Sequence, residues 1–292
     1  MVDQRGSLGQ LAPFHLLVDQ AVSAMGASLA AHHDVERALT ALDAELNGTA
    51  AEEIIDRLPR TRSELLDSVR EQLGEQTVKL SSNPLSNTDH VRILLLHQID
   101  AAWWSHVAPY ENRDAVDSAP ELLSLQELQK SGALRFRFAV QPVGWWGRGR
   151  DYVLKRATPR SRPRVAGMKF IVARAEIVAV LNEIADALAE RAPSGTPPLW
   201  VNSIVRSVEH QRHLADLGYF ALLPSSHCSG YGADVEMTWY ETFGAADALQ
   251  TILLEYRDRG VLNVIDEGQA WHLCLSPDHL ATYAAAATDL RG

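Results

Sequence analysis

The sequence predicts an α+β fold: a mostly helical N-terminal region followed by a small domain with an antiparallel sheet. Two observations lead to this prediction. Up to residue 133, apolar side chains recur at helical intervals between turn residues. From Pro197 onward, short strand-like runs alternate with amphipathic segments that end at glycine. With 292 residues, of which 46% are hydrophobic, the chain can bury a sizeable core.

The same patterns divide the chain into three parts. Residues 1–133 form a helical region to which no motif assigns a role. Residues 134–196 combine a strand, an Arg- and Pro-rich linker and a strong amphipathic helix. Residues 197–292 contain the alternating strands and helices, and we expect them to form the α+β domain.

The N-terminal helices follow from apolar spacing and from end signals. Residues 15–46 predict helix up to Asn47-Gly48, and a second helical stretch, interrupted near Pro59, runs from about residue 50 to 80. Thr61 and Glu64 have the spacing of a capping box within this second stretch. Two further helices are expected over residues 90–107, largely buried, and 119–132, which ends at glycine.

In the remainder of the chain, alternation predicts a half-buried strand over residues 134–142, followed by the linker. Ser276 is the expected cap of the last helix, with Pro277 in its first turn. Helices are expected over residues 175–195, 208–218, 244–260 and 276–290, and strands over residues 198–207, 233–239, 261–266 and 270–276.

Charge and composition disfavour several classes of partner. The net charge of −10, from 37 acidic and 27 basic residues, disfavours nucleic acid and anionic lipid surfaces. No apolar run approaches the roughly 20 residues of a membrane helix. We therefore expect a cytoplasmic protein and leave its oligomeric state open. Two cysteines are too few for a disulfide scaffold, although a single bridge between Cys228 and Cys274 remains open.

One polar stretch, PSSHCSGYGADVEMTW, contains residues that could bind a metal. Asp234 lies seven positions after His227, and the intervening Gly230 and Gly232 permit the tight turn that would bring both side chains to one ion. His272, on a predicted neighbouring strand, is a candidate third ligand. The competing interpretation is a polar surface loop together with a buried structural histidine.

These residues, in this order, resemble the D-Ala-D-Ala metallopeptidases of the lysostaphin/hedgehog-type zinc superfamily. The resemblance covers roughly the last third of the chain, from about residue 197. Residues 1–170 have no counterpart in it. The matching positions are Arg206, Ser207, Gln211, Ser225, His227, Gly230, Asp234 and Trp271-His272.

The resemblance implies a small zinc-peptidase-like domain in which His227, Asp234 and His272 hold Zn²⁺. A water at the fourth position would have its pKa lowered toward neutrality, and a carboxylate would accept its proton. Arg206 would stabilise charge on the scissile carbonyl oxygen or hold a substrate carboxylate. A structural ion pair is the alternative role for Arg206.

The sequence departs from the family at the catalytic base. Family members carry Glu three residues before the last His, and here that position is Gln269, which accepts no proton. Glu267, in the same turn, is the favoured replacement, although it could be only a solvated turn residue, and Glu236 is the second candidate.

The function implied is a zinc-dependent hydrolase of a small peptide or peptide-like amide, with dipeptides containing D-amino acids among the candidate substrates. Two alternatives stay open. One is a catalytically inactive zinc-binding relative that acts as a binding module. The other is a helical interaction protein whose C-terminal domain anchors a partner.

Overall fold

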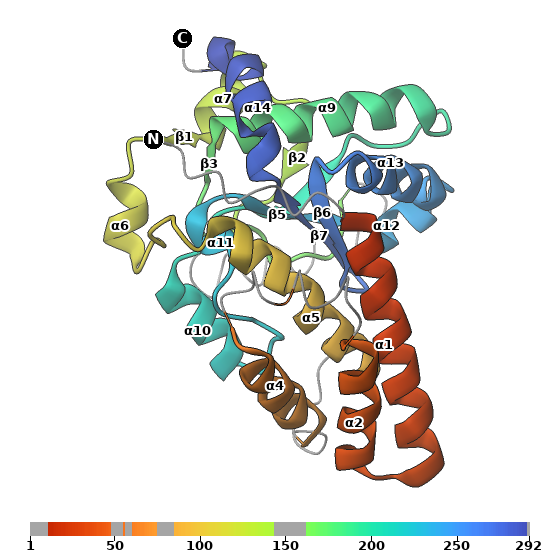
Figure 1. The fold of residues 1–292 in the computed structure, drawn as a ribbon. Coiled ribbons are helices and arrows are strands. Elements are labelled where there is room, and N and C mark those ends of the chain that lie inside the picture. The colour runs from red at the N-terminus through yellow and green to blue at the C-terminus, as the bar shows by residue number, and fades with distance from the viewer. Residues whose placement is uncertain (1–10, 48–54, 56–59, 75–84, 143–161, 291–292) are drawn as a thin grey trace.

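The computed structural model describes residues 11–47, 55, 60–74, 85–142 and 162–290, and Figure 1 shows their arrangement. It confirms the α+β class: helices dominate the N-terminal part, and a mixed, mainly antiparallel sheet lies in the C-terminal part. Within the described residues, no helix is both long and apolar enough to cross a membrane. Residues 143–161, the larger part of the expected linker, lie outside this description.

The N-terminal region is built of helices whose ends follow local signals. They are α1 (Leu11–His32), α2 (Val35–Glu45), α4 (Arg62–Gly74) and α5 (Asn87–Trp104). The capping box of Thr61 and Glu64 is confirmed, because each residue's side chain accepts a hydrogen bond from the other's backbone N–H.

The prediction of one continuous helix from residue 15 to 46 is wrong. Asp34 interrupts it by accepting hydrogen bonds from the backbone N–H groups of Glu36 and Arg37, which makes it the N-cap of α2. His33, just before it, has a positive φ of 51°. The local hydrogen bonds of an Asp side chain therefore outweigh the continuous apolar spacing.

The expected helix over residues 119–132 is shorter than predicted, because α7 (Leu125–Ser131) follows a strand, β1 (Leu122–Ser124). Gly132 ends α7 in the left-handed conformation. β1 pairs with β3 (Val172–Arg174) in a separate two-stranded sheet. The short helix α6 (Arg113–Asp117) precedes them.

The central sheet has the strand order β2-β4-β5-β7-β6. Its strands are β2 (Arg137–Phe138), β4 (Trp200–Ser203), β5 (Gly232–Glu236), β6 (Leu262–Asp266) and β7 (Ala270–Leu275). All neighbours are antiparallel except β2 and β4, which run parallel. Because β2 lies before residue 197, the sheet includes a strand from the middle part of the chain.

The remaining helices surround this sheet. They are α9 (Ala175–Arg191), α10 (Val208–Asp216), α11 (Ser226–Ser229), α12 (Thr238–Glu241), α13 (Ala246–Asp258) and α14 (Leu280–Ala286). In Figure 1, α9 and α14 lie above the sheet, whereas α5 lies below it. Ser276 caps the short 3₁₀ turn Pro277–His279 before α14, as expected.

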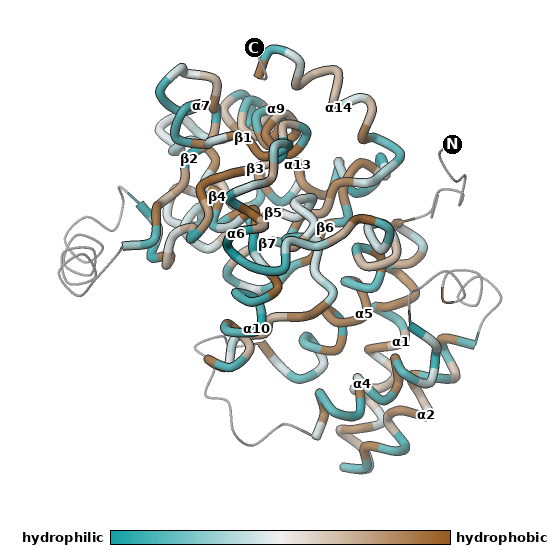
Figure 2. The backbone as a smooth tube through the Cα atoms, turned by 90° about the vertical axis from the view of Figure 1, so that its left-hand side faces the viewer, coloured by the Kyte–Doolittle hydropathy of each residue, from teal (hydrophilic) through white to brown (hydrophobic). Residues whose placement is uncertain are grey.

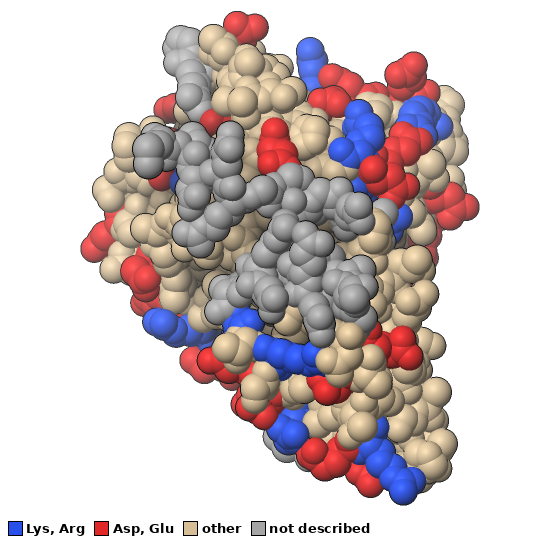
Figure 3. Space-filling view, in the orientation of Figure 1, with Lys and Arg blue, Asp and Glu red and all other residues tan. Residues whose placement is uncertain are grey.

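Helix α5 links the N-terminal helices to the sheet. It packs against α1 and α4 on one side and against β6 and α11 on the other. Figure 2 shows a hydrophobic stretch along it, and twelve of its residues are buried. Three of these twelve, His97, Gln98 and Asp100, are polar, so the helix carries polar groups into the interior. On the face shown in Figure 3, by contrast, acidic and basic side chains are intermixed at the surface.

Candidate metal centre

The turn from α11 into β5 places His227 beside Asp234. Gly230 ends α11 with φ of 81°, a conformation that glycine adopts without strain. Gly232 is required for a different reason: a Cβ there would lie 2.6 Å from Ser226 Oγ and 3.0 Å from the backbone N of His227. The two glycines thus allow the chain to fold closely back on itself between the two candidate ligands.

The three predicted ligands converge on one point. Asp234 and His272 lie directly opposite each other in the pairing of β5 with β7. Asp234 Oδ1 lies 3.0 Å from His227 Nε2 and 3.1 Å from His272 Nδ1. One potential ligand atom from each residue lies within 4.8 Å of the other two, and all three residues are buried. The structure therefore contains a group that could hold a metal ion.

Hydrogen bonding decides which nitrogen of His227 faces this point. Its Nδ1 lies 2.6 Å from the carbonyl oxygen of Ile204, which can only accept, so Nδ1 carries the proton. Burial lowers the pKa of His227, which favours the neutral ring. A neutral His227 therefore directs the lone pair of Nε2 at Asp234 Oδ1.

His272 is held in a complementary way. Its Nε2 lies 2.7 Å from Asp100 Oδ2, so Nε2–H donates to that carboxylate and Nδ1 faces Asp234. In the metal-free protein, burial acts to lower the pKa of His272. The hydrogen bonds and charges of Asp100 and Asp234 outweigh burial and raise that pKa to about 10. Without a cation, a proton on Nδ1 therefore bridges His272 and Asp234.

Arg206 binds the other oxygen of Asp234. Its guanidinium forms an ion pair with Asp234 Oδ2 and also donates to Ser203 Oγ at 2.9 Å and Gln211 Oε1 at 3.3 Å. Burial would raise the pKa of Asp234, but its interactions with His227 and with the charged Arg206 hold it well below its usual value. This contact is the ion-pair role considered from the sequence, and it leaves Oδ1 free to face the histidines.

When both histidines are neutral, their ring protons point away from the three ligand atoms, toward Ile204 and Asp100, so that no proton lies between those atoms. His227 Nε2, Asp234 Oδ1 and His272 Nδ1 then each present a lone pair to the same small volume. Three facing acceptors repel one another unless a cation lies between them. Because each ligand is also fixed by an outer partner, the arrangement has the two shells typical of protein metal sites.

Glu267 lies next to this centre. Its Oε1 is 2.9 Å from His97 Nε2, and its side chain is 28% exposed. His97, Glu267 and His272 form a second group of potential metal ligands within 4.8 Å. The ring of His97 also packs on that of His272, with centroids 4.5 Å apart. Glu267 is therefore bound to a buried histidine beside the site, rather than being only a solvated turn residue.

The other two positions considered for the base are arranged differently. Gln269, at the position of the family's glutamate, is exposed. Glu236 is buried, but its carboxylate accepts hydrogen bonds from Asn202, Thr238 Oγ1 and the backbone N–H of Trp239. Glu236 thus stabilises the start of α12, and it belongs to neither group of potential ligands among the described residues.

The sequence interpretation missed three site residues: His97, Asp100 and Ser226. Asp100 Oδ2 accepts from Ser226 Oγ at 2.9 Å as well as from His272. A signal was present in the segment LLLHQIDAAWW, where polar residues interrupt an apolar helix. Buried polar groups require partners, so His97 and Asp100, three residues apart on one helix face, pointed to an interior polar site.

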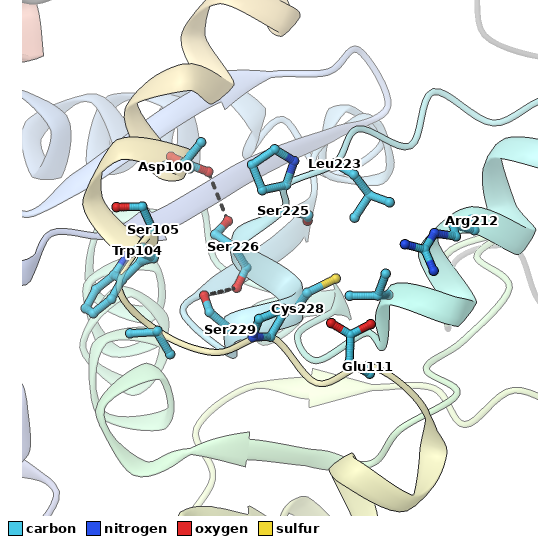
Figure 4. Close-up of a pocket in the computed structure, with 15 residues that line it drawn as sticks. Asp100, Trp104, Ser105, Glu111, Arg212, Leu223, Ser225, Ser226, Cys228 and Ser229 are labelled. Carbon is cyan, nitrogen blue, oxygen red and sulfur yellow. Dashed lines mark hydrogen bonds between the residues drawn. The ribbon is translucent and has the colours of Figure 1, made fainter. Parts of the chain in front are cut away.

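A cavity of about 390 Å³ lies beside the centre, between α5, α10 and α11. Figure 4 shows Asp100 and Trp104 at one side and Arg212 at the other, with Ser226 and Cys228 between them. Burial raises the pKa of the Cys228 thiol to about 12, which makes it unreactive at neutral pH. Cys228 and Cys274 are both free, so no disulfide joins them.

Ser226, His272 and Asp234 also follow one another at hydrogen-bond distances, as in a nucleophilic serine hydrolase. Ser226 Oγ lies 3.2 Å from His272 Nε2, and Nδ1 of that ring lies 3.1 Å from Asp234. However, Asp100 already accepts the Nε2 proton of His272 and the hydroxyl proton of Ser226. His272 therefore has no free lone pair toward Ser226, and the arrangement favours metal binding over serine activation.

Comparison with known proteins found no matching family model, no matching curated protein and no matching solved structure.

Proposed function

We propose that the protein is a zinc-dependent hydrolase of a small peptide or peptide-like amide, with His227, Asp234 and His272 as the metal ligands. The observation that carries this proposal is the convergence of three potential ligand atoms, each on a residue that is fixed from outside by a separate partner. Asp234 Oδ1 lies 3.0 Å from His227 Nε2 and 3.1 Å from His272 Nδ1. Two ligand atoms of a tetrahedral zinc site with metal–ligand distances of about 2.0 Å are separated by about 3.3 Å, which is close to these values.

The donor set supports zinc over calcium or magnesium. Two imidazole nitrogens and one carboxylate oxygen suit zinc, whereas calcium and magnesium prefer shells of oxygen. When bound, zinc would supply Lewis acidity and lower the pKa of a water at its open position. His227 and His272 would both be neutral as ligands, and Arg206 would keep Asp234 ionised and oriented.

Glu267 is the proposed general base in place of the residue missing at Gln269. It is partly exposed, so a substrate can approach it, and His97 holds its carboxylate beside His272. A carboxylate in this place would accept the proton of the attacking water and return it to the leaving amine. Arg206 is assigned a ligand-orienting role, because Asp234 occupies its guanidinium.

Metal content tests the first half of the proposal. The wild-type protein should bind about one zinc per chain, and the His227→Ala variant should bind none. His213→Ala, which alters an exposed histidine on α10, is the control and should bind zinc like the wild-type protein. Metal would be measured by mass spectrometry after dialysis against a weak chelator. Equal zinc content in wild-type protein and His227→Ala would overturn this ligand assignment.

Activity tests the second half. The zinc-loaded protein would be assayed on a panel of L- and D-dipeptides, and Glu267→Gln should reduce kcat about 100-fold or more without loss of zinc. Glu236→Gln is the matched control and should retain activity, because the carboxylate of Glu236 accepts hydrogen bonds at the start of α12 and belongs to neither group of potential ligands. If activity were unchanged in Glu267→Gln, this residue would not be the base.

The second candidate function is a catalytically inactive zinc-binding module. Its support is the exposed Gln269 at the family's base position and the deep burial of the ligands, with His272 only 1% exposed. This alternative predicts the same zinc content but no hydrolysis of any dipeptide in the panel. A stoichiometric zinc protein without activity would favour it over the hydrolase.

A further inference from the structure

We propose that Asp100, on helix α5 of the N-terminal region, is the positioning residue that makes His272 a metal ligand through Nδ1. The proposal rests on the metal site proposed above and assigns part of that site to the first 133 residues. Asp100 is 1% exposed, and its Oδ2 lies 2.7 Å from His272 Nε2. By accepting the Nε2 proton, it makes Nδ1 the nitrogen that faces the other ligands and that binds the metal once its own proton has left.

The backbone carbonyl of Leu96 fixes the direction of the hydrogen bond between Asn263 and Asp100. Asn263 Nδ2 lies 3.1 Å from Leu96 O and 2.7 Å from Asp100 Oδ1. Because a carbonyl oxygen can only accept, the amide nitrogen of Asn263 must point at both, and Asp100 Oδ1 must accept. The orientation of this buried amide is thereby determined.

The opposite end of Asn263 is also held. Its Oδ1 lies 2.8 Å from Nε2 of His15, a buried residue of α1, which donates to it. A chain of buried polar groups therefore runs from α1 through β6 and α5 to the metal site on β7. Each link has a donor facing an acceptor, ending with Nε2–H of His272 donating to Asp100.

Other residues do not substitute for Asp100 in this position. Ser226 Oγ also approaches His272 Nε2, but its proton is donated to Asp100, and a hydroxyl carries no charge to hold the ring. His97 Nδ1 lies 3.5 Å from Asp100 Oδ2, farther than either of the two donors. The carboxylate is therefore the group that sets which His272 nitrogen carries the proton.

The test compares metal affinity in Asp100→Asn and Glu236→Gln, with zinc as the probe and a competing chromophoric chelator as the readout. The Asn variant keeps the shape of the side chain, but its amide can turn its NH₂ toward His272 Nε2 and favour the wrong tautomer. We expect zinc affinity about 10- to 100-fold below wild type. Glu236→Gln, which also neutralises a buried carboxylate, should bind zinc like wild type.

A second measurement needs no variant. Nitrogen-15 NMR of the zinc-loaded wild-type protein should show His272 protonated at Nε2 and bound through Nδ1. Binding through Nε2, or unchanged affinity in Asp100→Asn, would overturn the positioning role and leave the zinc site intact. A wild-type protein that binds no zinc would instead overturn the proposed function itself.

Discussion

Zinc binding should become tighter with rising pH because the ion replaces one proton. In the metal-free protein the pKa of His272 is about 10, so this ring is almost fully protonated at pH 7. The pKa of His227 is lowered and that of Asp234 lies well below its usual value, so neither has a proton on its metal-facing atom near pH 7. One proton, from His272, must therefore leave when zinc binds.

The release of one proton determines the size of the effect. Apparent affinity should rise about tenfold per pH unit, or about 100-fold from pH 6 to pH 8, which corresponds to about 2.7 kcal/mol. Isothermal titration calorimetry in buffers of different ionisation enthalpy would count the released protons directly. The His213→Ala variant, altered only at an exposed position, should give the same slope.

Two results would refute this reasoning. An affinity that is constant between pH 6 and 8 would mean that His272 is neutral in the metal-free protein or does not bind zinc. A rise of about 100-fold per unit would mean that a second proton is released when zinc binds.

The same pKa shift contributes to the pH dependence of folding without metal. Because the folded-state pKa of His272 lies above the value of about 6.5 expected in the unfolded chain, protonated His272 stabilises the metal-free fold. This contribution is complete below pH 6.5 and is lost as the pH rises through about 10. Urea denaturation of the metal-free protein at pH 7 and pH 9.5 would measure the loss.

Two further predictions concern the supports of the site. Arg206→Leu should lower the free energy of unfolding of the metal-free protein by about 3 kcal/mol, because it removes the guanidinium that forms an ion pair with the buried Asp234. Urea denaturation of the variant and of the wild-type protein would measure this difference. Gly232→Ala should destabilise the protein by about 1–3 kcal/mol and weaken zinc binding, since its Cβ would meet Ser226 Oγ and force α11 to move. Gly74→Ala, where a Cβ meets nothing within 4 Å, is the control and should change stability by less than about 1 kcal/mol. Equal melting temperatures and zinc affinities for Gly232→Ala and Gly74→Ala would contradict the role given to the close turn.

Much of the fold could be predicted from local patterns. The order of helices and strands in the C-terminal part follows from apolar spacing and glycine ends, and β6 and β7 form the expected antiparallel neighbours. The prediction failed where a single polar side chain acts against the pattern, as Asp34 does in ending one helix and starting the next. Such hydrogen bonds depend on backbone geometry, which periodicity alone does not report.

The sequence by itself pointed to the three candidate ligands and to the turn that joins two of them. His227 and Asp234 are seven residues apart, and the glycines between them are a local requirement that can be read from the chain. The opposite placement of His272 also follows once β5 and β7 pair in register.

Only the tertiary structure decided how those candidate ligands are held. Asp100 meets His272 across 172 positions of sequence, and His97 meets Glu267 across 170. No local spacing encodes these contacts, because they arise when the apolar face of α5 packs on β6 and buries its polar residues with it. The ion pair of Arg206 with Asp234 likewise depends on where Asp234 lies in the folded chain.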